Sequence, residues 1–512
     1  MRTRRVSDSP ILIGVDVGTT NVKAAAYDAG GRTLAVVSRA LETSHPQPEW
    51  TEYEPQALFD SAADTVRSVV ARIESRAITG IAVSSMAETA VPVDAKGHSL
   101  RPAIAWHDPR TAPQAAWWEQ HLGAEVVYSI TGLPILPIFG INKLMWIKEH
   151  EPEVYGRIAH WLNIADYIAF RLCGVPATNL SLASRTMALD LRARQWSSEL
   201  LSACDIAPAI LGDLVPSGER IGQVHQAASE RTGLPVGTAV MAGAMDHPCG
   251  ALALGIRQPG DILDSMGTTE SILTVLLEPV LTSEMARSGY QQGIHADPDK
   301  VYCSGGLYTA GAAVEWVKTL LAGSNSPYAD LVDLANVAPP GSGGVFFLPH
   351  LRLATPPIND ASSRAAFIGL DANTSPSHLI RAVIEGLAYE AQFSIDGLEQ
   401  LLGFRAERLR AIGGGTRNAL QMQVKAALHG RPIEISDVEE ATTLGAAILA
   451  AVGTEVFPNM DAAVDAMQVS YRNITADDRS GQFYRRSYET VYRDLYRTLA
   501  PLHHAVAAMQ PV

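Results

Sequence analysis

The feature that most constrains the fold of this sequence is a turn that occurs twice, half a chain length apart. An apolar run from Ile11 to Val17 precedes Gly18-Thr19-Thr20, and a second apolar run follows. The same order returns after Asp261, around Gly267-Thr268-Thr269. A strand, a tight turn and a strand form a β-hairpin. Two units of one architecture, each with this turn at a strand end, are the economical interpretation. A chance duplicate is the alternative.

The rest of the 512-residue chain alternates between helical and strand patterns. Apolar residues at helical spacing precede the strand-like run 78–84; they are Leu58, Ala62, Val66, Val69 and Ile73. In the second half, helices are predicted over 377–401 and 418–429, with a strand and turn over 409–415 between them. The fold class is therefore α/β. The predicted division is an N-terminal domain 1–255, a C-terminal domain 256–475 and a helical tail 476–512.

Composition excludes several kinds of partner. The 40 Lys and Arg residues against 54 Asp and Glu residues give a net charge of −14. An overall negative field repels phosphate backbones, so no nucleic-acid partner is expected. Tyr484, Tyr488 and Tyr492 alternate with arginines in the tail. A terminal helix that docks its apolar stripe is favoured there over a nucleic-acid face.

Four cysteines are spread along the chain without a pair at CxxC spacing. This pattern argues against a zinc ribbon, a dithiol redox site and a disulfide scaffold, and it predicts a reducing cytoplasm. No run approaches the ~18 apolar residues of a membrane-spanning helix, so no membrane partner is expected.

The phosphate-binding signatures of P-loop NTPases, protein kinases and simple Rossmann enzymes are absent. The Gly-Thr-Thr turns offer backbone amides and hydroxyls to phosphate oxygens instead. Asp16, two residues before the first turn, would hold Mg²⁺ through water. Two such turns facing each other across a cleft would clamp the terminal phosphates of a nucleotide. An ordinary hairpin turn is the alternative for each.

Two further glycine-rich elements follow. Gly413-Gly414-Gly415 would let a flat ring or a ribose lie against bare backbone, with Asn418 as donor and acceptor at the next helix start. Gly311 and Glu315 lie in a run of small residues that opens a helix. Close helix packing explains that run equally well.

Asp246 is the candidate for proton transfer, because small and apolar residues surround it just before an apolar helix. Spacing alone leaves a helix cap or a general base open and favours the cap. His247 is a rival base. The segments 84–89 and 106–110 would wall a pocket for a polyhydroxylated ligand, with an aromatic face beside charged groups. A surface salt bridge beside a core tryptophan is the alternative.

Taken in order, these motifs resemble those of the FGGY carbohydrate kinases, a family of the actin and hexokinase ATPase superfamily. The resemblance covers residues 10–455. It implies a two-domain actin-like ATPase (ribonuclease H-like) fold, in which each domain is a mixed sheet flanked by helices and the active-site cleft lies between the domains. It also implies ATP as the substrate, Mg²⁺ as the cofactor and a small sugar, polyol or sugar acid as the acceptor.

The resemblance assigns roles to individual residues. Asp246 falls at the catalytic base, and Asp16 at the water-mediated Mg²⁺ ligand. The ATP and phosphate site would contain Thr19, Thr20, Gly267, Thr268, Thr269, Gly311, Glu315, Gly414, Gly415 and Asn418. The sugar site would contain Met86, Glu88, Trp106, Asp108 and Asp246.

The acceptor remains open at this point because the pocket departs from the family patterns. Ala87-Glu88 stands where glycerol kinases have Arg-Glu and xylulokinases have Met-His, and His247 replaces the usual Gln or Asn. A xylulokinase-like ketopentose kinase is expected, with gluconokinase-like and erythritol- or polyol-kinase-like enzymes as alternatives. A non-catalytic, nucleotide-switched actin-like binding protein is the distant alternative. The resemblance to the family also predicts a homodimer.

Overall fold

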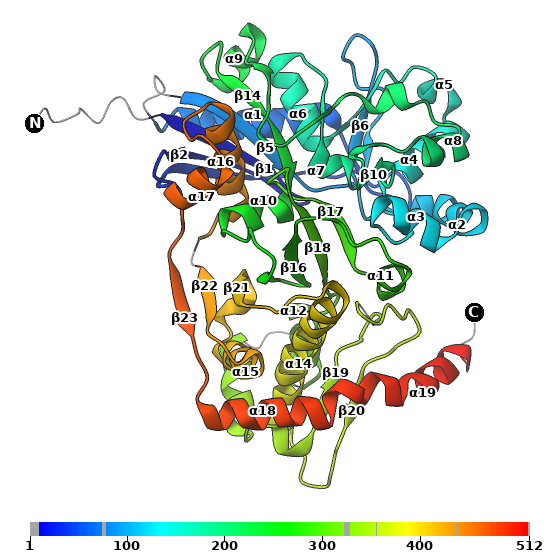
Figure 1. Ribbon diagram of the computed structural model, residues 1–512, viewed down its shortest axis with the longest axis vertical. Coiled ribbons are helices and arrows are strands. Elements are labelled where there is room, and N and C mark those ends of the chain that lie inside the picture. The colour runs from blue at the N-terminus through cyan, green and yellow to red at the C-terminus, as the bar shows by residue number, and fades with distance from the viewer. Residues whose placement is uncertain (1–9, 74–77, 322–327, 355, 437, 510–512) are drawn as a thin grey trace, which may run out of the picture.

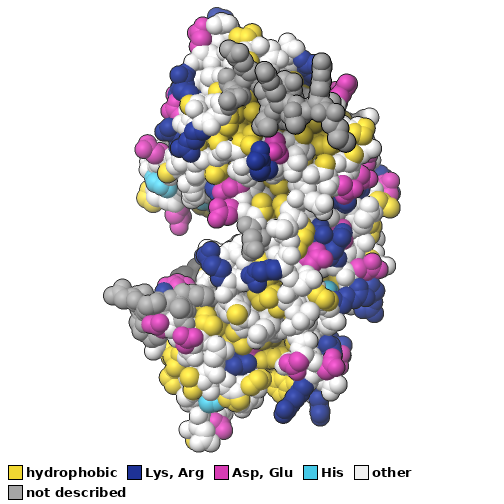
Figure 2. All heavy atoms as spheres, turned by 90° about the vertical axis from the view of Figure 1, so that its left-hand side faces the viewer, with side chains coloured by type: hydrophobic (Ala, Val, Ile, Leu, Met, Phe, Trp, Pro, Cys, Tyr) yellow, Lys and Arg dark blue, Asp and Glu magenta, His cyan; other side chains and the backbone are white. Residues whose placement is uncertain are grey.

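The computed structural model describes residues 10–73, 78–321, 328–354, 356–436 and 438–509. An N-terminal half and a C-terminal half lie one above the other, each built on a mixed β-sheet (Figure 1). Figure 2 shows a notch in the outline between the two halves. In the described ranges, no helix combines the length and the apolar character needed to cross a membrane.

In the part of the chain that the structure describes, the first half has a six-stranded sheet. Its order is β13 (Arg220–Gln223), β14 (Ala239–Met245), β5 (Ile78–Ser85), β1 (Ile11–Val17), β2 (Asn21–Asp28) and β3 (Thr33–Ala40). Strand β1 is antiparallel to β2 and parallel to β5, which is parallel to β14. One face of this sheet packs against α1 (Pro55–Val70) and α6 (Ile164–Cys173).

The second half repeats this arrangement in a seven-stranded sheet, again counted over the described residues. Its order is β17 (Gln291–Ile294), β18 (Val301–Leu307), β16 (Glu270–Leu276), β15 (Asp261–Met266), β21 (Arg408–Ile412), β22 (Ile433–Ser436) and β23 (Tyr471–Ile474). Strand β15 is antiparallel to β16 and parallel to β21, as β1 is to β2 and β5. The predicted duplication is thereby confirmed. Helices α12 (Gly311–Leu321), α14 (Pro376–Leu402) and α15 (Ala419–His429) share its core.

Smaller elements connect these layers. In the first half they are β4 (Glu52–Tyr53), β6 (Ala90–Val93), β7 (Ala103–Ile104), η3 (Pro109–Thr111), α2 (Ala112–His121), α3 (Ala124–Thr131), α4 (Gly140–His150), α5 (Pro152–Tyr155), β8 (His160–Asn163), β9 (Thr178–Asn179), α7 (Leu180–Ala183), β10 (Leu189–Asp190), β11 (Gln195–Trp196), α8 (Ser198–Ala203), η4 (Pro208–Leu211), β12 (Leu214–Val215), α9 (Gln226–Thr232) and α10 (Asp246–Ala253). In the second half they are α11 (Ser283–Ser288), α13 (Tyr328–Val337), η5 (Ser342–Gly344), β19 (Phe346–Leu348), β20 (Ala366–Ile368), η6 (Gly414–Arg417), α16 (Ala441–Gly453), α17 (Met460–Ala466), α18 (Asp478–Thr490), η7 (Tyr492–Asp494) and α19 (Leu495–Met509).

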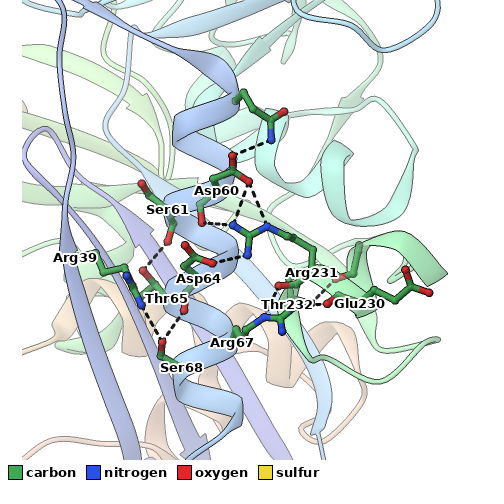
Figure 3. A network of polar contacts seen from close by, with 12 residues as sticks. Arg39, Asp60, Ser61, Asp64, Thr65, Arg67, Ser68, Glu230, Arg231 and Thr232 are labelled. Atoms are coloured by element: carbon green, nitrogen blue, oxygen red, sulfur yellow. Dashed lines mark hydrogen bonds and ion pairs between the residues drawn. The ribbon is translucent and has the colours of Figure 1, made fainter.

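Helix α9 is held on α1 by a surface network of ion pairs (Figure 3). Arg231 contacts the carboxylates of Asp60 and Asp64, and Arg67 donates to backbone carbonyls of α9. Since exposed ion pairs contribute little to stability individually, this network orients α9 rather than holding the fold together.

Helix α16 lies in the predicted C-terminal domain 256–475 by sequence, but it packs against the sheet of the N-terminal half. It follows β22 in the chain, yet it lies with α10 against the first sheet (Figure 1). Its apolar residues share a buried cluster with Leu12 of β1 and Ala82 of β5. A Cβ atom at Gly445 would lie 2.0 Å from the Cys249 carbonyl oxygen of α10. The second half therefore helps to position α10, which begins at Asp246.

Replacing Gly14 with Ala is expected to lower the free energy of unfolding by about 1–3 kcal/mol or more, the cost of overpacking. The reason is that a Cβ atom at Gly14 would lie 1.8 Å from the Thr443 carbonyl oxygen of α16. Denaturant unfolding measures this loss. Gly156→Ala is the control, because Gly156 has φ −64° and its added Cβ would meet nothing closer than 3.4 Å. Equal stability of the two variants would contradict the close contact of α16 with β1.

The tail docks as predicted, although η7 divides it into α18 and α19. Tyr484, Tyr488 and Tyr492 are buried, and each donates its hydroxyl to a carboxylate of α14. The donor–acceptor distances to Glu385, Asp396 and Glu390 are 2.7, 2.6 and 2.8 Å, respectively. Because the three phenols are buried and bonded to α14, the stripe docks the tail on that helix.

Candidate active site

The first Gly-Thr-Thr turn joins β1 to β2. The Gly18 amide donates to the Asn21 carbonyl at 2.9 Å, and the Thr19 carbonyl accepts from the Tyr53 hydroxyl at 2.9 Å. Among the described residues, no group accepts a hydrogen bond from the amides of Thr19 and Thr20. Two adjacent backbone amides without a protein acceptor form a site suited to an anion.

The second turn is held by the start of α12. The amides of Ala310 and Ala312 donate to the Thr268 carbonyl, and that of Gly311 donates to the Gly267 carbonyl, each at 3.1 Å. A Cβ atom at Gly311 would lie 2.7 Å from the Gly267 oxygen, so Gly311 is needed for close packing. The carbonyls point to α12, and each planar peptide turns its amide the other way. The Thr268 and Thr269 amides likewise have no acceptor in the described chain.

The remaining predicted nucleotide residues lie around this second turn. A Cβ atom at Gly413 would lie 2.4 Å from the Met266 oxygen, and one at Gly415 would lie 2.7 Å from the Met266 Cβ, so the loop that contains Gly414 packs on the end of β15. Asn418 is buried and caps α15 by accepting from the Gln421 amide at 3.1 Å. The sequence did not predict that role. Glu315 is exposed and pairs with Lys318 at 2.5 Å.

Two carboxylates meet at the carboxyl ends of β1 and β14. Asp16 lies on β1, and its Oδ1 atom is buried without a hydrogen-bond partner in the described chain. Burial, and then the charge of Asp246, raise the pKa of Asp16 well above its usual range. Asp246 is the first residue of α10, and its Oδ1 accepts from the His247 amide at 2.7 Å. Because Met245 holds the N-cap position, the preference for a cap at Asp246 was wrong.

This pair of carboxylates fits a divalent cation. An unpartnered buried oxygen beside a second negative charge is stabilised by a cation, and Mg²⁺ binds through one or two carboxylates, water and substrate phosphates. The described residues contain no group of three or more His, Cys, Asp and Glu side chains that would form a complete protein cage. The donor set therefore suits Mg²⁺ that arrives with a phosphorylated ligand.

A hollow of about 250 Å³ lies between the halves. Its lining includes Trp106, Arg185, Met245 and His247 from the first half, and Thr269, Glu270, Gln291, Tyr302 and Tyr308 from the second. The Trp106 indole N–H donates to the Thr19 hydroxyl at 3.1 Å. Trp106 thereby connects the hollow to the first turn, while Thr269 of the second turn lines it directly.

Glu88 stands behind this hollow in an unusual backbone conformation, with φ 61°. Its carboxylate accepts from the Arg185 Nε at 2.7 Å, and its carbonyl accepts from the Lys143 Nζ at 2.5 Å. Burial lowers the pKa of Lys143 to about 7, although the charge of Glu88 opposes this shift. The buried side chains of Arg185 and Lys143 thus fix both ends of Glu88.

Of the predicted sugar contacts in the described chain, Trp106 lines this hollow, whereas Met86, Glu88, Asp108 and Asp246 are not among its lining residues. Asp108 is only 1% exposed, and each of its oxygens accepts two hydrogen bonds, from the Thr51 amide and from the backbone and guanidinium of Arg110. Burial alone would raise the pKa of Asp108, but the bonds from Arg110 lower it below its usual range. Met86 is 3% exposed and belongs to the core of the first sheet. Asp108 is thus held by Thr51 and Arg110, and Met86 packs in the core of the first sheet.

Several of the residues that line the hollow were not predicted from the sequence. Arg185 donates from Nη1 to the Tyr302 hydroxyl at 3.4 Å, which joins the two halves. Gln291 and Tyr308 come from β17 and from the end of β18. Single polar residues on loops and strand ends carry no periodic signal.

Comparison with known proteins identifies the family. The model of the N-terminal domain of FGGY carbohydrate kinases matches residues 11–253, and the model of the C-terminal domain matches residues 263–454. The chain belongs to the FGGY family of carbohydrate kinases. It is therefore a sugar kinase, a phosphotransferase with an alcohol group as acceptor, and the alternative of a non-catalytic binding protein was wrong.

Individual FGGY kinases match along almost their whole length. A xylulose kinase of Staphylococcus xylosus is 30% identical over 485 residues, covering 94% of this chain and 99% of that protein. An L-fuculokinase of Escherichia coli (strain K12) is 29% identical over 466 residues, covering 90% and 96%. The crystal structure of xylulose kinase from Rhodospirillum rubrum superposes with a TM-score of 0.89 at 28% identity, covering 96% and 100%. The predicted two-domain actin-like fold is confirmed.

Proposed function

We propose that this FGGY kinase transfers the γ-phosphoryl group of ATP to a hydroxyl of a ketopentose, with xylulose as the preferred acceptor. The observation that carries the proposal is the hollow that Trp106, His247 and Thr269 line together. An aromatic face, the start of α10 and a phosphate-type turn meet there, as transfer to a sugar requires. The relatives named xylulose kinase support the choice of acceptor.

In this proposal the nucleotide lies along the second half. The free amides of both turns bind the terminal phosphates, and the glycine loop accommodates the adenosine. The contributing residues are Thr19, Thr20, Gly267, Thr268, Thr269, Gly311, Glu315, Gly414, Gly415 and Asn418. Asp16 holds Mg²⁺ through water, and when bound, this ion neutralises charge on the transferring phosphoryl group.

Asp246 acts as the general base. Its carboxylate accepts the proton of the acceptor hydroxyl as that oxygen attacks the γ-phosphorus. The turn amides hold the phosphates in line, so positioning and charge stabilisation contribute most of the rate. Trp106 presents its ring to the C–H face of the sugar, and Glu88 fixes the pocket through Arg185.

A coupled ADP-release screen tests the acceptor. It covers ketopentoses, deoxysugars such as L-fuculose, tetritols and aldonates, each with ATP and Mg²⁺. We expect the highest kcat/KM with D-xylulose. A higher value with another class would replace xylulose as the acceptor, and the absence of stimulation by any sugar would contradict the proposed function.

The domain division at residues 255 and 475, the homodimer and the cytoplasmic location stay predictions from the sequence. The first boundary falls between α10 and β15, and the second falls between β23 and α18.

A further inference from the structure

The arginine side chain that lines the hollow, Arg185, already has its charge balanced by a carboxylate. Within the described chain, Arg185 is the only Lys or Arg that lines it. The guanidinium contacts Glu88 Oε1 from Nε at 2.7 Å and from Nη2 at 2.5 Å. Both side chains are less than a tenth exposed. Because both side chains are buried, separating the two charges would leave each of them uncompensated. Arg185 and Glu88 therefore remain paired.

Two buried lysines that contact residues around the hollow, Lys143 and Lys425, are also paired. The Lys143 ammonium is buried and donates to the carbonyls of Glu88 and Ile138. Lys425 is bound to Glu270 at 2.7 Å, and it is buried behind that lining residue. Asp246 adds a negative charge at the start of α10. The lysines, arginines and carboxylates around the acceptor site therefore sum to a neutral or negative field.

Uncharged polar groups form a further part of the recognition surface, beside His247, Glu270 and apolar side chains. Gln291, Tyr302 and Tyr308 line the hollow from the second half. Their amide and hydroxyl groups donate to and accept from sugar hydroxyls without a net charge. A carboxylate, in contrast, loses its hydration in such a site unless a cation replaces it.

We propose that the buried Glu88–Arg185 pair makes this kinase select neutral sugars and polyols and reject sugar acids. This inference rests on the proposed function and narrows its acceptor class. Glu88 is the specificity-determining residue, and it acts through Arg185. Its carboxylate cancels the one guanidinium to which an acidic substrate would bind.

Glu88→Gln is the decisive variant. Glutamine keeps the shape and one acceptor oxygen for Arg185 but removes the negative charge, which leaves the guanidinium uncompensated towards the hollow. We expect the ratio of kcat/KM for xylonate to that for xylulose to rise at least about tenfold, as one unit charge is worth at a few Å. The change should come mainly through KM for the acid.

Arg185→Met should move the same ratio in the opposite direction, because Glu88 is then an uncompensated negative charge. Circular dichroism shows whether each variant folds. If one variant fails to fold, the other still tests the proposal. Glu385→Gln is the matched control, since Glu385 pairs with Arg381 at 2.7 Å, equally buried, outside the hollow. It should leave the ratio unchanged.

The outcomes separate this inference from the proposed function. A wild-type enzyme that prefers xylonate to xylulose overturns the inference and the choice of xylulose as acceptor, but it leaves the proposed phosphoryl transfer from ATP to a sugar hydroxyl intact. A folded Glu88→Gln variant with an unchanged ratio overturns it as well. A wild-type enzyme that no sugar stimulates contradicts the proposed function first.

Discussion

Asp246→Asn is expected to lower kcat at least ~10²-fold, in line with the contribution of a general base. Asparagine keeps the size of the side chain but accepts no proton from the sugar hydroxyl at neutral pH. The affinity for ATP should change little, because the turn amides and the glycine loop hold the nucleotide. Steady-state ADP release gives kcat, and equilibrium binding of an ATP analogue gives the affinity.

Asp213→Asn is the matched control for this charge change. Asp213 is exposed and lies outside the residues that line the hollow, so its variant should turn over at the wild-type rate. Near-normal kcat in Asp246→Asn would remove Asp246 from the mechanism and would favour His247, which lines the hollow, as the base.

Lys425→Met is expected to lower the free energy of unfolding by about 3–5 kcal/mol, the cost of removing one partner from a buried ion pair. Lys425 bonds Asp264 of β15 and Glu270 of β16, and all three side chains are buried. The variant would leave two adjacent carboxylates without a cation. Because Glu270 follows Thr269 directly, we also expect a higher KM for ATP.

The loss of unfolding free energy in Lys425→Met should grow with pH. Burial, and then the charge of Asp264, already raise the pKa of Glu270, and removing Lys425 raises it further. A carboxyl with a raised folded-state pKa favours folding below its unfolded pKa of about 4.3 and loses that contribution as pH rises through the folded value. Denaturant unfolding at pH 5 and pH 8 should therefore show the larger loss at pH 8.

Lys318→Met is the control for this variant. Lys318 is buried too, but its partner Glu315 is 56% exposed. Water solvates that carboxylate once the lysine is gone, so the loss should stay within about 1 kcal/mol. Similar losses for Lys318→Met and Lys425→Met would show that the Asp264–Lys425–Glu270 cluster has no special role.

The sequence predicted those parts of the candidate site that a short run of consecutive residues marks. The two turns, the three-glycine loop and Asp246 each occupy a short segment between apolar runs, and the structure places them at strand ends, where the sequence put them. Asp108 shows the limit of this reasoning. Its residue type suited a sugar contact, but only the folded structure shows that Arg110 and Thr51 occupy both of its oxygens.

By itself, the sequence determined the paired sheets and the order of the phosphate turns, because apolar periodicity and glycine turns act within a few residues. Only the tertiary structure decided that α16 packs on the first sheet against Gly14, and that Arg185 reaches Glu88. These contacts join residues far apart in the chain. They depend on which surfaces are buried together, and burial is a property of the assembled core.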